Sequence, residues 1–130
     1  MTEMTNEVLL SAQNLSVRFG GVLAVNNVSF DVKQGEVFTL IGPNGAGKTT
    51  VFNLISRIYT PTTGDIDYLG PQGLLRLTEQ PPQAVAGLGI ARTFQNIELF
   101  EHASVLHNLL IGRHTHRATG LWQDLFFTAK

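Results

Sequence analysis

The 130-residue chain contains no cysteine and one tryptophan, and charged residues make up only 15% of it. Without cysteine there is no disulfide framework and no cysteine-based metal or redox site. The net charge of −1 and the lack of any run of lysine or arginine give no general attraction to nucleic acid or anionic lipid. Hydrophobic residues make up 43% of the chain, which is typical of a globular domain with its own core.

Long apolar segments are also missing from the sequence. No apolar run approaches the ~20 residues needed to span a bilayer. A role at a membrane would therefore require docking onto an embedded partner. Residues 1–7 are polar and lack the basic and then apolar layout of a signal peptide, and we expect them to form a flexible tail.

The most informative stretch is glycine-rich and has the sequence GPNGAGKTT, from Gly42 to Thr50. Gly42, Gly47, Lys48 and Thr49 fit the phosphate-binding loop pattern G-x-x-x-x-G-K-[ST]. The glycines let backbone amides approach an anion, Lys48 supplies a positive charge, and the Thr49 hydroxyl can ligate Mg²⁺. The alternative is a glycine-rich turn in which Lys48 is merely solvated.

The sequences on either side of this loop favour the phosphate-binding interpretation. The apolar run 37–41 predicts a buried strand that leads into the loop. Apolar residues at helical spacing from Val51 to Ile58 predict a helix that ends near residues 57–59. Strand, glycine loop and helix in this order predict an α/β fold of the P-loop NTPase class.

The region before the loop predicts an antiparallel β layer. The segment 9–19 alternates between apolar and polar side chains in its second half, with Leu15, Val17 and Phe19 on one face. Residues 28–32 also alternate, and Gly20-Gly21 forms a turn between the two segments. The segment 33–36 then turns the chain into the strand before the loop.

The region after the loop helix predicts shorter elements. Residues 65–69 and 90–94 predict two strands, whereas residues 74–80 are expected to be irregular or loosely helical. Pro81-Pro82 is expected to start a helix. Ser104 is a candidate N-cap for a helix over residues 105–110.

Three features in ordered spacing resemble the N-terminal half of an ABC-transporter ATP-binding subunit. Phe19 lies 29 residues before Lys48 and is similar to the aromatic A-loop residue. The loop GPNGAGKTT is similar to the Walker A motif, and Gln95, 47 residues after Lys48 in the sequence RTFQ, is similar to the Q-loop residue. The stretches FGGVLAVNNVSF from Phe19 and GIARTFQN from Gly89 resemble the LivG type, the ATPase of branched-chain amino acid importers. Importers of urea or short amides use very similar ATPases.

This resemblance implies an ABC ATPase core with an N-terminal antiparallel β layer and the start of a helical subdomain. It implies a flexible tail at 1–7, an ATP-binding core at 8–100 and the beginning of the helical subdomain at 101–130. The family's signature motif, Walker B aspartate with its catalytic glutamate, and switch histidine do not occur in these 130 residues. We therefore expect a truncated N-terminal portion of an ATPase, inactive by itself.

The resemblance also implies a set of site residues. Lys48 and Gln95 would be catalytic, Thr49 and Gln95 would hold Mg²⁺, and Phe19 would stack on the adenine of ATP. The remaining ATP contacts would come from Gly42, Asn44, Gly45, Ala46, Gly47, Lys48, Thr49 and Thr50.

Three of these assignments have a plain structural alternative. Phe19 could be a core residue of a strand, Thr50 an ordinary first-turn residue, and Gln95 an exposed residue at a strand end. Arg92, three residues earlier, is expected to face solvent.

The histidines and the last aromatic residues give weaker signals. His114 and His116 have no third metal ligand nearby, so a solvated loop is the preferred interpretation. His102 and His107 flank Ser104 and are expected at the surface. Trp122, Phe126 and Phe127 are expected to belong to the helical subdomain.

The partners and location follow from the resemblance alone. They are transmembrane permease subunits, a second ATP-binding subunit, identical or different, and indirectly a periplasmic solute-binding protein, with no nucleic acid. The location is peripheral, at the cytoplasmic face of the inner membrane. Three other functions stay open: a soluble ABC ATPase acting on DNA or ribosomes, a P-loop kinase or GTPase, and a non-catalytic nucleotide-binding fragment.

Overall fold

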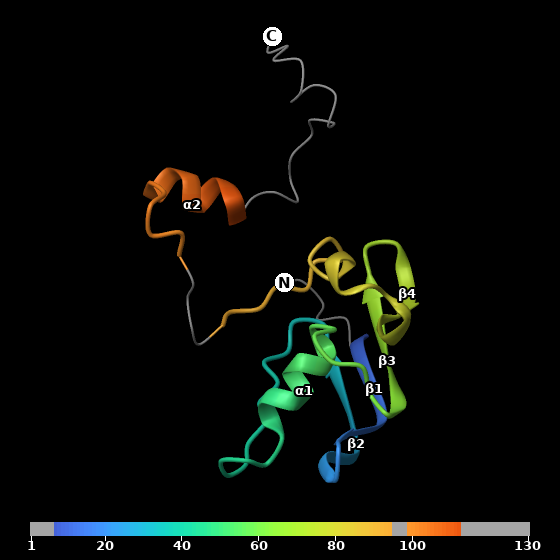
Figure 1. Ribbon diagram of the computed structural model, residues 1–130. Coiled ribbons are helices and arrows are strands. Elements are labelled where there is room, and N and C mark those ends of the chain that lie inside the picture. The colour runs from blue at the N-terminus through green and yellow to red at the C-terminus, as the bar shows by residue number, and fades with distance from the viewer. Residues whose placement is uncertain (1–6, 95–98, 113–130) are drawn as a thin grey trace. The chain divides into compact units, whose positions relative to one another are not determined.

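The computed structural model describes residues 7–94 and 99–112 (Figure 1). The chain forms two compact units, residues 1–92 and 93–130, and the domain boundary expected at residue 100 stays a prediction. Residues 1–6 of the predicted tail and Gln95 lie outside the described residues. So does the segment that contains His114, His116 and the last aromatic residues.

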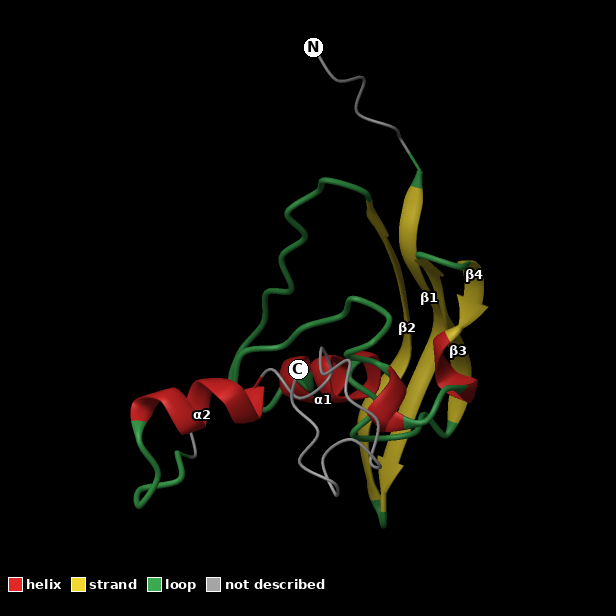
Figure 2. Ribbon diagram, turned by 90° about the horizontal axis from the view of Figure 1, so that it is seen from above, coloured by secondary structure: helices red, strands yellow, loops and turns green. Residues whose placement is uncertain are grey.

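The first unit is built on a four-stranded antiparallel sheet with the strand order β2-β1-β3-β4. Two hairpins form it, and the turn of the first is the predicted Gly20-Gly21. Helix α1 lies on one face of the sheet (Figure 2). The bounds are β1 Val8–Phe19, β2 Val22–Lys33, α1 Lys48–Ile55, β3 Thr63–Gly70 and β4 Gly73–Arg76.

An asparagine in β1 changes which positions of that strand face the core. Before Asn14 the buried residues are the even-numbered Leu10 and Ala12, and after it they are the odd-numbered Leu15 and Val17. The strand therefore contains one extra residue at this point. Asn14 makes this shift with a positive φ of 51°, a conformation that asparagine adopts more readily than most residues. Its backbone amide donates to the Ser29 hydroxyl at 2.8 Å, which ties the bulge to β2.

The core lies between the sheet and α1. It contains apolar side chains at alternate strand positions and from one face of the helix, as the two periodicities predict. Tyr68 of β3 also donates its hydroxyl hydrogen to the Leu88 carbonyl at 3.2 Å, which holds residues 82–90 against the sheet. The buried residues are Leu10, Ala12, Leu15, Val17, Val25, Val51, Leu54, Ile66, Tyr68, Leu77 and Val85.

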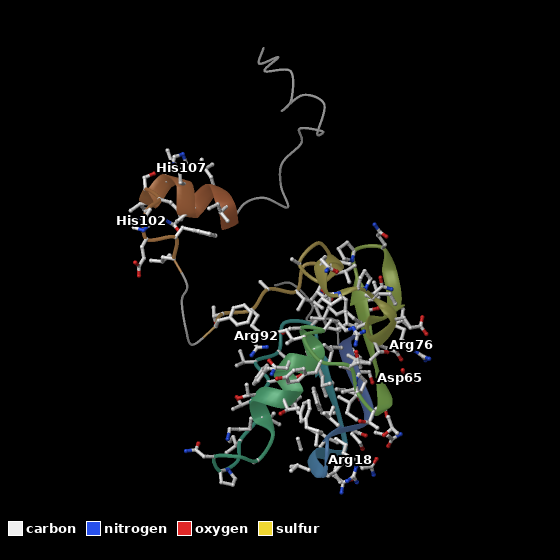
Figure 3. The ribbon with its side chains drawn as sticks, in the orientation of Figure 1. Arg18, Asp65, Arg76, Arg92, His102 and His107 are labelled. Carbon is white, nitrogen blue, oxygen red and sulfur yellow. The ribbon has the colours of Figure 1, made fainter. Side chains whose placement is uncertain are left out.

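The charges on β3 and β4 are paired with one another. Arg76 lies 3.4 Å from Asp67 and 3.7 Å from Asp65, and Figure 3 shows Arg76 and Asp65 side by side on these strands. The hydrogen bond to Asp67 and the charges of both carboxylates raise the pKa of Arg76 above its usual value.

Several sequence predictions are confirmed in this unit. The two alternating segments form β1 and β2, residues 65–69 lie within β3, and the helix follows the glycine loop. The helix ends at Ile55 rather than near residues 57–59, because Arg57 has a left-handed φ of 59° that breaks the helical path.

Two predicted strands are wrong, and two further segments differ from the prediction. Residues 37–41 and 90–94 are not strands, since within the described part of the chain no strand pairs with either segment. A buried parallel strand needs hydrogen-bonding neighbours that are distant in sequence, whereas a hairpin supplies its own. Residues 74–80 contain most of β4 and the 3₁₀ turn Leu77–Glu79, because Gly73 starts a tight return beside β3. Pro81-Pro82 starts only the short 3₁₀ turn Pro82–Ala84.

Helix α2, Val105–Gly112, is the described helix of the second unit. Ser104 caps it as predicted, because its hydroxyl accepts a hydrogen bond from the His107 amide at 3.2 Å. Asn108 folds back on Phe100, accepting from its amide at 3.0 Å and donating to its carbonyl at 3.2 Å. His102 and His107 are exposed, as expected. None of the described helices is long and apolar enough to cross a membrane.

Candidate functional site

The glycine-rich loop is a compact turn that passes directly into α1. The Ala46 amide donates to the Pro43 carbonyl at 3.2 Å, which closes the turn. Gly45 and Gly47 both have a φ of 84°, a left-handed conformation that L side chains rarely adopt. Gly47 occupies the N-cap of α1, and the helical hydrogen bonds begin with the Val51 amide donating to its carbonyl at 3.0 Å.

Gly47 is also the point at which the loop touches the sheet. A Cβ atom added to Gly47 would overlap the carbonyl oxygen of Ala24 in β2, and it would lie 3.4 Å from the Val25 side chain. Gly45, with the same φ, has nothing within 4 Å of such an atom. The sequence therefore requires glycine at 47 for two reasons, backbone conformation and close approach, and at 45 for one.

The Lys48 side chain folds back over the loop. Its ammonium group donates to the Gly42 and Pro43 carbonyl oxygens, both at 2.6 Å. The charge is thereby held above the backbone of the loop. Residues 42–50 contain no acidic side chain that could neutralise it.

The other predicted loop residues differ in exposure. Asn44, Ala46 and Thr49 are exposed, whereas Thr50 is half-buried in the first turn of α1. The helix has no acidic residue in this turn and no side-chain cap, so its N-terminal amides are open to an anion. The structure brings together all eight predicted residues between Gly42 and Thr50; Pro43, within the same loop, carries no predicted role.

Phe19 lies at the last position of β1, beside the hairpin turn. Its side chain is 44% exposed, so it is not the core residue that the alternative interpretation required. Its ring contacts the ring of Tyr59 edge to face, with centroids 4.9 Å apart and planes at 68°. Ala24, which touches the loop at Gly47, lies two residues beyond Val22, the partner of Phe19 in β2.

Arg92 has a role that its sequence context did not predict. Instead of facing solvent, its guanidinium donates to the Asn53 side-chain oxygen at 2.6 Å and to the Ser56 hydroxyl at 3.3 Å (Figure 3). Arg92 therefore fastens the chain after residue 90 to the second half of α1. The spacing gives no signal for this contact, because Asn53 and Arg92 are 39 residues apart.

Tyr59 was missed for a different reason. It follows α1 in an exposed turn, and nothing in the local pattern separates it from an ordinary surface aromatic. Its position could have indicated the contact, because Tyr59 lies between the end of α1 and the start of β3, where the chain returns to the sheet.

A cavity of about 370 Å³ lies between the sheet, α1 and the segments around residues 38–40 and 89–91. Its wall is almost entirely apolar, and the phosphate loop does not contribute to it. It is lined by Leu9, Leu10, Phe30, Val32, Phe38, Leu40, Val51, Phe52, Ile55, Tyr68, Gly89, Ile90 and Ala91.

Comparison with known proteins shows which proteins this chain is similar to. It is 46% identical over 123 residues to the high-affinity branched-chain amino acid transport ATP-binding protein LivG of Salmonella typhimurium, covering 95% of this chain and 47% of that protein. The LivG protein of Escherichia coli is 47% identical over the same length, and the BraF protein of Pseudomonas aeruginosa 44% over 122 residues. The chain spans about half the length of the curated relatives it matches.

Solved structures give the same picture. A nucleotide-free ATP-binding cassette from an ABC transporter superimposes with a TM-score of 0.71 at 31% identity, over 93% of this chain and 46% of that one. An ATP-binding cassette of an ABC transporter in its ADP conformation gives a TM-score of 0.70, also at 31% identity, over 95% of this chain and 46% of that one. The sequence model of the ABC transporter family matches residues 25–128, most of the chain and the whole glycine-rich loop. The kinase and GTPase alternatives are thereby set aside, and the chain belongs to the ABC transporter family.

Proposed function

We propose that this chain is the nucleotide-binding portion of the ATPase subunit of an ABC importer for branched-chain amino acids. The observation that carries the proposal is the left-handed Gly47, which joins a phosphate-type loop to α1. It occurs in a chain 46–47% identical to ATP-binding proteins of branched-chain amino acid transport. The full protein would use ATP binding and hydrolysis to drive solute uptake.

The donors at the loop suit a polyphosphate. Backbone amides after left-handed glycines form concave groups of donors that bind anions. The amides at the start of α1 add the partial positive charge of a helix N-terminus. Lys48 would exchange its two carbonyl acceptors at 2.6 Å for phosphate oxygens. Gly42, Asn44, Gly45, Ala46 and Thr50 would complete the contacts.

Magnesium would be held by oxygen ligands next to the phosphates. Thr49 carries an exposed hydroxyl in the first turn of α1, which suits a hard cation. Gln95, expected as the second ligand and as the group that orients the attacking water, lies outside the described residues. Bound Mg²⁺ would neutralise charge on the transferring phosphoryl group.

The base would stack on Phe19. Its half-exposed ring lies at the hairpin end nearest the contact between β2 and Gly47. Stacking accepts any base because every base has a π face, so Phe19 would contribute affinity rather than selectivity for adenine.

The proposal extends to partners and location. Permease subunits, a second ATP-binding subunit and, indirectly, a periplasmic solute-binding protein would complete the importer, at the cytoplasmic face of the inner membrane. An importer of urea or short amides and a soluble ABC ATPase remain the alternatives. The relatives' roles in branched-chain amino acid transport favour the first proposal.

Replacement of Lys48 tests the site. We expect Lys48→Ala to weaken ATP binding strongly in a calorimetric titration, because it removes the side-chain cation of the loop. Lys33→Ala is the matched control, since it removes an exposed lysine at the far end of β2 and leaves the loop unchanged. Unchanged ATP affinity in Lys48→Ala would show that the phosphate-loop assignment is wrong.

Uptake measurements test the solute. In a complete importer that contains this chain, we expect uptake of labelled leucine, isoleucine or valine that Lys48→Ala abolishes. Lys48-dependent uptake of urea or a short amide, with none of the three amino acids, would favour the alternative importer.

A further inference from the structure

Tyr59 packs its ring against the residue proposed to stack on the base. The two ring centroids are 4.9 Å apart and the ring planes make an angle of 68°. The Phe19 side chain is 44% exposed and that of Tyr59 37%. The contact therefore occupies one side of the Phe19 ring and leaves much of its surface open to a ligand.

The backbone around Tyr59 is fastened at both ends. On one side, the Tyr59 amide donates to the Asn53 carbonyl in α1 at 3.2 Å. On the other, Thr62 binds β1 twice: its amide donates to the Ser16 carbonyl at 2.7 Å, and its hydroxyl accepts from the Arg18 amide at 3.1 Å. Arg18 is labelled beside the hairpin turn in Figure 3. The backbone that carries Tyr59 is thus held at both ends.

Phe19 lies where the strand pairing of β1 comes to an end. It is the last residue of β1, and it pairs with Val22 of β2 across the turn. The pairing of β1 with β3 has already ended at Ser16 and Thr63. Among the described residues, Tyr59 is the aromatic ring that contacts Phe19. An exposed phenylalanine without such a neighbour samples several side-chain rotamers.

We propose that Tyr59 is a positioning residue that holds the Phe19 ring in the orientation needed to stack on the base of a nucleoside triphosphate. The inference rests on the proposed function of the loop and of Phe19. It adds a mechanical link, since α1 begins with Lys48 at the phosphate end and leads into the turn that carries Tyr59. One helix of eight residues thereby connects the phosphate-binding end of the site to the support of the base platform.

The test compares two ligands and two substitutions. Tyr59→Leu removes the ring but keeps an apolar side chain, whereas Tyr59→Phe keeps the ring and removes only the hydroxyl. ATP and inorganic triphosphate, each with Mg²⁺, are titrated calorimetrically against the wild-type chain and both variants. We expect Tyr59→Leu to weaken ATP binding by about 2- to 10-fold, the range for loss of one aromatic pair, and to leave triphosphate binding unchanged. Tyr59→Phe should retain wild-type affinity for both ligands.

A double-mutant cycle separates positioning from an independent contact. Once Phe19→Leu has removed the platform, adding Tyr59→Leu should cause no further loss of ATP affinity. Losses that multiply would overturn the inference, because Tyr59 would then act on the nucleotide without Phe19. An equal loss of ATP and triphosphate affinity in Tyr59→Leu would also overturn it, by showing a general structural role.

Binding of the two ligands to the wild-type chain shows whether this inference alone fails or the proposed function fails with it. Lys48-dependent binding of triphosphate with no added affinity for ATP would overturn the roles of Phe19 and Tyr59 and would preserve the phosphate loop. Absence of binding of either ligand would overturn the proposed function together with this inference. Thermal unfolding of each variant shows whether Tyr59→Leu remains folded, and Tyr59→Phe supplies the folded comparison.

Discussion

The core of the antiparallel sheet and the segment 37–41 are both rich in apolar residues, yet Val37 and Ile41 of the segment differ sharply in burial from the core residues of the sheet. Ile66 in β3 is 0% exposed and lies in a strand hydrogen-bonded on both sides. Ile41, just before the phosphate loop, is 88% exposed, and Val37 is 93% exposed. Phe38 of the same segment is 41% exposed and stacks on Phe30 of β2, with ring centroids 5.1 Å apart.

The difference shows that apolar composition makes a strand only where the backbone finds a partner. β1 and β2 are joined by a two-residue turn, so each supplies the other's hydrogen bonds. The segment 37–41 has no neighbouring strand in the described part of the chain, and it forms no regular secondary structure there.

The largest expected effect comes from removing the same atoms in the two regions. Ile66→Ala should lower the free energy of unfolding by about 2–5 kcal/mol, because it leaves a cavity in the core. Ile41→Ala should change it by less than about 0.5 kcal/mol, because the side chain is already in water. Urea denaturation of both variants measures the difference. Similar losses would show that residues 37–41 are packed in solution.

The two left-handed glycines of the loop differ in their surroundings, because Gly47 lies against the sheet and Gly45 faces open space. Gly47→Ala places a methyl group on the Ala24 carbonyl, so the loop or β2 must shift. Gly45→Ala meets no atom and should cost only about 1–2 kcal/mol of stability for its left-handed conformation. We expect Gly47→Ala to destabilise the chain more and to weaken ATP binding more. Equal effects in denaturation and titration would contradict the close approach.

Phe19 tests whether the exposed end of the sheet is a binding surface. Phe19→Ala should weaken ATP binding by roughly 1–3 kcal/mol, the range for stacking on a base. Binding of inorganic triphosphate should change little, since the phosphate loop is untouched. The control is Val22→Ala, the 67% exposed partner of Phe19 in β2, which carries no ring. If ATP and triphosphate lose equal affinity, Phe19 serves stability rather than the base.

The smallest expected effect concerns α2, whose apolar side chains are largely exposed. Packing contributes little to the stability of this helix, because Val105, Leu106 and Leu109 are 78%, 64% and 67% exposed. We therefore test its N-terminal cap. Ser104→Ala should destabilise this helix by about 1 kcal/mol through loss of the hydrogen bond to the His107 amide. Hydrogen exchange at residues 105–110 measures it, with Ser104→Asp expected to retain protection. Unchanged exchange in Ser104→Ala would rule out this cap.

Local chemistry explains which parts of the fold were predictable from the sequence. The hairpin of β1 and β2, the helix after the loop and the Ser104 cap depend on neighbours within a few residues or on a single periodicity. The strands expected at 37–41 and 90–94 depend on distant partners, and the pattern of apolar residues carries no information about those. β4 was missed because four residues give too short a pattern to separate a strand from an irregular turn.

The candidate site divides in the same way. Gly47 and Lys48 belong to one contiguous motif, so the sequence predicts their neighbourhood directly. The contacts of Phe19 with Tyr59 and of Arg92 with Asn53 join residues 40 and 39 positions apart. Such contacts arise only when α1 packs on the sheet and the chain returns past its end, which no local pattern encodes.

The position of the Lys48 ammonium has a consequence for which ligands can enter the loop. A ligand that binds the Lys48 ammonium must replace its hydrogen bonds to the Gly42 and Pro43 carbonyl oxygens, both at 2.6 Å. A neutral ligand such as a nucleoside or a polyol offers lone pairs no better than these oxygens and gains nothing by displacing them. A phosphate oxygen brings full negative charge, so its attraction to the ammonium exceeds that of a carbonyl dipole. The resting loop therefore discriminates by valence: occupancy should rise steeply from mono- to di- to triphosphate, before any group recognises the rest of the molecule.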